Sequence, residues 1–128
     1  MLNTVFSSLL KTNQGFIKLL RLHCSEDFQR TFRQGNKQKQ GGLVLYTRLN
    51  GLGYARLGLA IAKRVIPSAV SRNRFKRLIR ESFRLNQYRL PDIDIVIAVT
   101  NRSLYNNQVF LCDLDKQWSR LVVYYKRV

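Results

Sequence analysis

The sequence is poor in the side chains on which most catalytic and metal sites depend. Its 128 residues include one histidine, His23, and two cysteines, Cys24 and Cys112, which are too far apart to form a CxxC pair. This spacing indicates neither a zinc site nor a disulfide framework. A single histidine cannot supply a histidine-based metal site. We therefore interpret all three residues as structural.

Long apolar runs and nucleotide-binding motifs are missing as well. No stretch approaches the roughly 20 apolar residues that span a bilayer, and residues 1–10 lack the basic start and the apolar length of a signal peptide. We expect a cytoplasmic location and no membrane partner. The sequence contains neither a P-loop pattern nor GxGxxG, so nothing points to a small-molecule substrate.

Seven acidic residues leave little material for acid–base or metal catalysis. Three have simple explanations, in the first turn of a predicted helix or among arginines: Glu26, Asp27 and Glu81. Asp92 and Asp94 would share a strand face and bind Mg²⁺ as a nuclease pair does. Because they follow Pro91, where aspartate is common in turns, we favour a structural role. A stand-alone metal nuclease stays as an alternative.

The sequence has an excess of positive charge. It contains 23 lysines and arginines against seven acids, for a net charge of +16. Self-repulsion of this size disfavours the compact state, so a partner that neutralises the charge is the simplest explanation. Nucleic acid is the first candidate and an anionic membrane surface the second. The 45% hydrophobic content indicates a folded domain.

The apolar periodicity predicts one α+β domain over residues 19–128, after a loosely ordered extension over 1–18. In chain order we predict a helix over 26–34, a loop over 35–42, strands over 43–49 and 54–62, a helix from Ser68 or Ser71 to Tyr88, a strand over 93–99 and a helix from Asn106 or Asn107. The alternative is a third, edge strand formed by residues 38–42 of this loop. The turn residues 50–53 predict a hairpin between the strands that flank them. The last helix has a core stripe: Leu111, Leu114, Trp118, Leu121, Val122 and Tyr125. We expect helices packed on one mostly antiparallel sheet.

The stretch 71–84 is a basic helix with two distinct faces. At 100° per residue, its apolar residues and Ser82 fall within an arc of roughly 140°. The adjoining arc is cationic and consists of Arg72, Lys76, Arg77, Arg80 and Arg84. Arginine pairs bidentately with phosphate, so we predict that this helix binds RNA. Asn73 either contacts that RNA or caps the helix locally.

Three aromatic residues form a second candidate surface: Phe28, Phe32 and Tyr46. If the first helix packs at the sheet edge, these rings would provide a platform on which single-stranded bases stack. Core packing is the competing explanation. From the residues alone we favour it for the two phenylalanines and leave Tyr46 open. Lys63 and Arg64 lead from the preceding strand into the basic helix.

Two runs, LGLAIAKRV over 57–65 and AVSRNRFKRLIRESFR over 69–84, resemble the signature of the bacterial ribonuclease P protein component. The helix at Glu26–Phe32 and the strands at 43–46 and 92–96 also fall where that family has them. The resemblance covers about residues 20–125. The chain departs from the family at Ala62, where serine is frequent, and at Ile66-Pro67, where glycine follows the valine. Both departures concern the loop before the basic helix.

The resemblance implies an α-β-β-β-α-β-α fold with a left-handed crossover, although crossovers between parallel strands are usually right-handed. It also implies a subunit of a ribonucleoprotein that removes the 5′ leader from precursor tRNA, with catalysis by the RNA and its Mg²⁺. The protein would have no catalytic side chain and would bind no metal or cofactor alone. By resemblance, the residues facing the catalytic RNA are Arg72, Asn73, Arg74, Lys76, Arg77, Arg80 and Arg84. Those lining the leader cleft are Phe28, Phe32, Tyr46, Lys63 and Arg64. The alternative is a ribosomal-type structural RNA-binding protein without an enzyme role.

Overall fold

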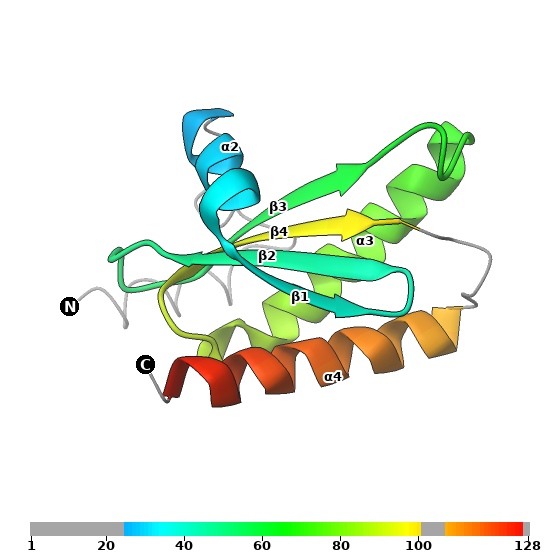
Figure 1. Ribbon diagram of the computed structural model, residues 1–128. Helices are drawn as coiled ribbons and strands as arrows, with labels where there is room; N and C mark the ends of the chain where they lie inside the picture. Colours follow the sequence, from blue (N-terminus) through cyan, green and yellow to red (C-terminus); the bar gives the residue numbers. More distant parts are fainter. Residues whose placement is uncertain (1–24, 101–106, 127–128) are drawn as a thin grey trace, which may run out of the picture.

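A four-stranded sheet with helices on both faces organises residues 25–100 and 107–126, the part of the chain that the computed structural model describes (Figure 1). Its elements are α2 (Ser25–Gln34), β1 (Asn36–Gln40), β2 (Leu43–Leu49), β3 (Arg56–Ile61), α3 (Ala69–Asn86), the 3-10 helix η2 (Gln87–Arg89), β4 (Ile93–Val99) and α4 (Asn107–Lys126). This order confirms the α-β-β-β-α-β-α prediction. The expected extension over 1–18, its boundary, His23, Cys24 and Asn106 lie outside the described residues.

The predicted hairpin across residues 50–53 is wrong, because β4 lies between β2 and β3. The strand order is β1-β2-β4-β3, with antiparallel β1–β2 and β2–β4 pairs and a parallel β3–β4 pair. β4 buries three isoleucines on one face and Val96 on the other. Only an interior position gives such a strand neighbours on both sides. Gly51 and Gly53, both at positive φ, allow the tight turns with which the chain leaves β2.

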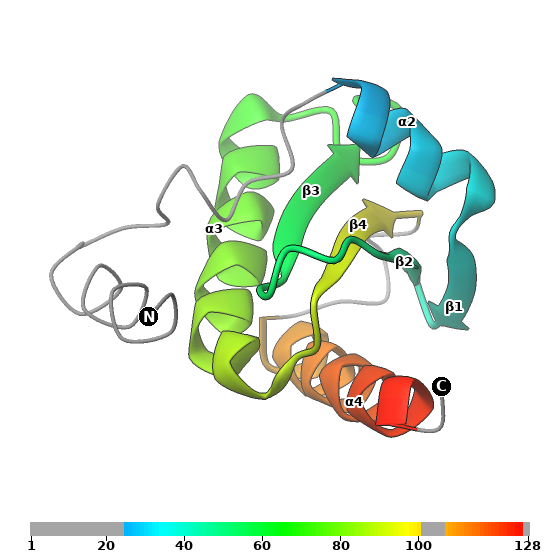
Figure 2. The ribbon, with the colours of Figure 1, turned by 90° about the vertical axis from the view of Figure 1, so that its left-hand side faces the viewer.

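The two faces of the sheet are covered unequally. α3 and α4 lie on one face and α2 on the other (Figure 2). The main core fills the α3 and α4 side, where side chains such as Leu45, Ile95 and Phe83 are fully buried. The predicted stripe on α4 is confirmed. Leu114, Trp118 and Leu121 are buried, and the stripe's other three residues pack against the edge of the core.

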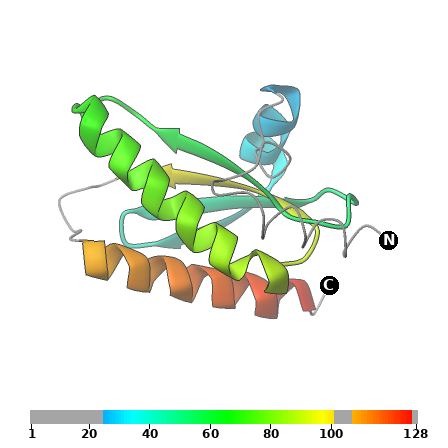
Figure 3. The ribbon, with the colours of Figure 1, turned by 180° about the vertical axis from the view of Figure 1, so that it is seen from behind.

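β3, α3 and β4 form a crossover between two neighbouring parallel strands. Viewed from the α3 side, with both arrows pointing left, β3 lies above β4, as in a left-handed crossover (Figure 3). The connection that precedes α3 is packed rather than loose, because Ile66 is fully buried in the core. Within residues 25–100 and 107–126, no helix has the length and apolar character that crossing a membrane requires.

Candidate nucleic-acid interface

The basic helix α3 is held to the core by its apolar face. Ser68 caps its N-terminus by accepting a hydrogen bond from the Ser71 amide (3.3 Å). Phe75, Ile79 and Phe83 are buried. The indole N–H of Trp118 donates to the Ser82 hydroxyl (2.9 Å), which explains a polar residue on the buried face. Asn73 is therefore not the helix cap.

The predicted RNA-binding residues of α3 differ in how strongly the protein itself engages them. Asn73, Arg74 and Arg77 are exposed on the outer side of the helix. The remaining four are half-buried: Arg72, Lys76, Arg80 and Arg84. The outermost three are thus the most accessible to a partner, and the others lie along the margins of the same surface.

Arg72 and Arg84 form hydrogen bonds with neighbouring groups. Arg72 donates from one guanidinium nitrogen to the carbonyl oxygens of Ile66 (2.9 Å) and Pro67 (2.8 Å), so it fixes the connection before the helix. Arg84 forms a two-point ion pair with Glu81 (2.5 and 3.2 Å). The hydrogen bonds from Arg84 lower the pKa of Glu81 and raise that of Arg84. Glu81, the single acid on this helix, therefore stays ionised. It neutralises charge only at the margin of the cationic surface of α3.

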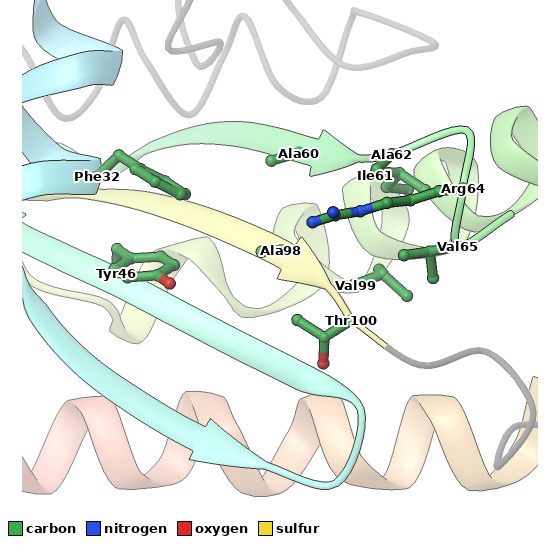
Figure 4. Close-up of a pocket in the computed structure, with 10 residues that line it drawn as sticks. All are labelled: Phe32, Tyr46, Ala60, Ile61, Ala62, Arg64, Val65, Ala98, Val99 and Thr100. Carbon is green, nitrogen blue, oxygen red and sulfur yellow. The ribbon is translucent and has the colours of Figure 1, made fainter.

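A cleft of about 640 Å³ lies on the opposite face of the sheet, between α2 and the connection from β3 to α3 (Figure 4). Its lining residues are Phe32, Tyr46, Ala60, Ile61, Ala62, Arg64, Val65, Ala98, Val99 and Thr100. The Phe32 and Tyr46 rings approach to 4.6 Å between centroids, at 37°. The Arg64 side chain extends over β4 toward Phe32. The cleft combines two rings, a floor of small residues and one cation.

Three of the five predicted cleft residues line this cleft: Phe32, Tyr46 and Arg64. Phe28 is half-buried on α2 and Lys63 is exposed beside Arg64, and neither is among the lining residues. The expectation from the residues alone that Phe32 packs in the core is wrong, since 41% of it is exposed. Sequence reasoning missed the alanine floor, although its signal was present. Small residues alternate over 58, 60 and 62, as one face of a strand requires.

A buried ion pair fixes α2 beside the cleft. Arg56 of β3 donates from Nε and Nη2 to the two oxygens of Asp94 on β4, each at 2.8 Å. The same Nη2 donates to Asp27 of α2 (3.2 Å), and the Asn50 side chain donates to Asp94 (2.9 Å). These contacts raise the pKa of Arg56, with the hydrogen bonds to Asp94 as the largest cause, although burial acts in the opposite direction. Four segments, α2, β3, β4 and the turn that contains Asn50, therefore meet at this cluster.

This cluster also changes the interpretation of Asp27 and Asp94. Asp27 serves as an ion-pair partner across 29 residues as well as a first-turn acid. Asp94 lies within β4, only 3% exposed, and its oxygens already accept three hydrogen bonds. Over residues 25–100 and 107–126, no three His, Cys, Asp or Glu side chains meet as metal ligands. The hydrogen bonds that Arg56 and Asn50 donate to Asp94 disfavour the nuclease alternative, because they occupy the oxygens that would bind a metal ion.

The C-terminus of α2 approaches β2 directly at Gly35. A Cβ atom there would collide with the carbonyl oxygens of Thr31 and Thr47. The Gly35 amide donates to Thr31 (2.9 Å), which ends the helix. Glycine is therefore required by close packing, and that packing sets the position of Phe32 one turn earlier in α2.

Comparison with known sequences points to one family. The family model for ribonuclease P matches residues 16–122. The ribonuclease P protein component of Aliivibrio fischeri is 42% identical over 110 residues, which cover 85% of this chain and 94% of that protein. The same component from Vibrio campbellii is 43% identical over 109 residues, covering 84% and 92%.

Comparison of structures agrees. The RNase P protein of Staphylococcus aureus superposes with a TM-score of 0.73 at 25% identity, covering 80% of this chain and 97% of that one. The RNase P protein of Thermotoga maritima gives a TM-score of 0.65 at 30% identity, covering 80% and 94%. The similarity thus extends over nearly the whole of each relative.

We predict that Asp94→Asn destabilises the protein much more than Asp92→Asn. Removing one partner of a buried ion pair costs about 3–5 kcal/mol, and the lower end is expected because Asp27 still faces Arg56. Asp92 precedes the strand, is half-buried and has no such pair in the described residues. Urea unfolding would measure the difference, and hydrogen exchange would show α2 opening first. Equal stability of the two variants would contradict this prediction.

Proposed function

This chain belongs to the ribonuclease P protein family, and we propose that it binds the catalytic RNA of that enzyme through α3 and the 5′ leader of precursor tRNA through the cleft. The protein then contributes to tRNA 5′-end maturation without a catalytic side chain of its own. The Mg²⁺ that the reaction uses is held mainly by the RNA.

The observation that carries this proposal is that the basic helix and the cleft lie on opposite faces of the sheet. Figure 2 shows α3 on one face of the sheet and α2 on the other. The cations belong to α3, and the cleft lies on the α2 side. The connection over residues 62–68 joins them, since Arg64 lines the cleft and Arg72 binds the connection's carbonyl groups. A protein of this shape meets two RNA segments at once and fixes their relative position.

The chemistry of the cleft suits a single strand of any sequence. Aromatic rings stack on every base, and the alanine floor lets a base approach the sheet closely. Arg64 supplies positive charge for phosphate. Thr100 contributes the only side-chain hydroxyl group besides that of Tyr46 among the lining residues. With so few groups to read base edges, the cleft favours the leader's shape and charge over its sequence.

The acids support a catalyst outside the protein. Four of them are already bound to arginine: Glu26, Asp27, Glu81 and Asp94. Acid–base or metal chemistry needs carboxylates that are free to act on a reacting group, whereas these four are occupied as ion-pair partners of arginine. The protein's contribution is therefore binding and orientation.

The proposal predicts that the purified chain stimulates a bacterial ribonuclease P RNA. Precursor-tRNA cleavage should rise most at low Mg²⁺, where added protein cations offset the repulsion between two RNAs. The protein without RNA should not cleave. Failure to stimulate at any Mg²⁺ concentration would contradict the proposal. Co-purification with ribosomal RNA in place of a smaller structured RNA would favour the ribosomal-type alternative.

Tyr46→Ala should weaken binding of leader-bearing precursor far more than binding of mature tRNA. A lost base–aromatic stack costs about 1–3 kcal/mol, or roughly 5- to 150-fold in affinity. Tyr46→Phe keeps the ring and should retain most of the binding. Tyr124→Ala, which removes an exposed tyrosine ring from α4, away from the cleft, serves as the control. An equal loss for both RNAs would argue against leader binding in the cleft.

Arg77→Ala should weaken the protein's binding to the RNA subunit and lower the salt dependence of that binding. Each phosphate contact adds about 0.9 to the slope of log affinity against log salt. Arg77 is exposed on the outer side of α3. Lys116→Ala, exposed on α4, removes the same charge from another surface. If both variants lose the same slope, net charge alone explains the binding and the assignment to α3 fails.

A further inference from the structure

β1 carries two lysines on the cleft side of the sheet, in a stretch expected from sequence to be mostly loop. Lys37 pairs with Tyr46 of β2, and Lys39 pairs with Val44. Cross-strand partners project from the same face, so both lysines share the face on which Tyr46 lines the cleft. Gln38 projects the other way and donates its amide to Gln117 of α4. The direction of the lysines is thus fixed by register and by this contact.

Lys39 continues a row of paired residues that starts on the cleft floor, and Lys37 lies on the same face two residues earlier in β1. Lys39 pairs with Val44, Val44 with Ala98, and Ala98 with Ala60. Ala98 and Ala60 both line the cleft. Three strand spacings of about 4.8 Å put the lysine end of this row roughly 14 Å from the β3 end. A single strand that crosses the sheet through the cleft reaches β1 next.

The hairpin that carries these lysines is anchored to the rim of the cleft. The amide and the hydroxyl of Thr100, a lining residue, both donate to the carbonyl oxygen of Gly42 (2.7 and 3.1 Å). Gly42 belongs to the two-residue turn between β1 and β2. Lys39, next to this turn, therefore keeps a defined position relative to the cleft.

The charges on β1 are not neutralised within the described part of the chain. Both lysines are exposed, and neither forms an ion pair with a carboxylate of residues 25–100 or 107–126. The Lys37 ammonium lies 6.0 Å from the centroid of the Tyr46 ring, at the distance of a cation–π contact. This contact brings a cation to the ring on which a base would stack.

We propose that the leader-binding surface extends beyond the aromatic cleft onto β1, where Lys37 and Lys39 bind phosphates of leader nucleotides that have crossed the sheet. The proposal rests on the proposed function, because it assigns a further contact to the same RNA strand. Lysines on an edge strand also discourage pairing with other sheets. That role alone requires no effect on RNA, so binding measurements separate the two.

The test uses the reconstituted ribonucleoprotein and precursor tRNAs whose leaders lengthen by one nucleotide at a time. The double variant Lys37→Ala/Lys39→Ala should match wild type on mature tRNA and on the shortest leaders. Above a threshold length its affinity should fall below that of wild type. The slope of log affinity against log salt should drop there by about 1.4, for two single-strand contacts. Lys37→Arg/Lys39→Arg should restore both.

The matched control, Lys116→Ala/Lys126→Ala, removes two exposed charges from α4 and should bind every leader length as wild type does. Wild-type behaviour of the β1 double variant at all lengths would overturn the inference, as would an equal loss on mature tRNA. Tyr46→Ala, measured on the same series, separates the two proposals. If it discriminates leaders while the β1 variant does not, the cleft stands and its extension falls. If the wild-type protein shows no leader preference, the proposed function itself fails.

Discussion

The position of α2 depends on one guanidinium group. Arg56, with a side chain only 17% exposed, binds Asp94 through two hydrogen bonds and reaches Asp27 with the same fork. A buried charge of this kind is tolerated only when its partners satisfy it fully, and Asn50 completes the set on Asp94. Asp27 fixes one end of α2, and the close approach of Gly35 to β2 fixes the other, so the helix has one position on the sheet. This position brings Phe32 into contact with Tyr46.

The sheet serves different purposes on its two faces because strand residues alternate. On the α3 side, large aliphatic residues fill the core. On the cleft side, small residues leave open space above the strands. β4 contributes to both, with Ile95 and Ile97 inward and Ala98 on the cleft floor. A bulky residue at 98 would occupy the cleft, and a small one at 97 would leave a cavity in the core. The same strand is thus constrained twice.

Local patterns predicted the basic helix and the strand over 93–99 well, because their apolar periods are strong and their ends have turn residues. Sequence reasoning failed where pairing is non-local. The turn at residues 50–53 is real, but no local signal indicates that a strand 40 residues later enters between its neighbours. The Arg56 cluster joins residues 29 and 38 positions apart, which no spacing rule detects. Lys37 and Lys39 were missed because NKQKQ lacks the apolar alternation that identifies a strand.

Phe32 shows why the two explanations for the aromatic residues were hard to separate from sequence. Phe28 and Phe32 share a helical face, which fits either a core or a stacking platform. In the structure the sheet beneath α2 is covered near Asp94, and the helix leaves Phe32 at the rim with 41% of its surface exposed. Leaving a phenyl ring half in water forgoes part of the roughly 1.5–3 kcal/mol that full burial contributes. Its contact with Tyr46 holds the ring in place. Under the proposed function, a base that stacks in the cleft would meet a surface that is already ordered, and binding would cost less entropy.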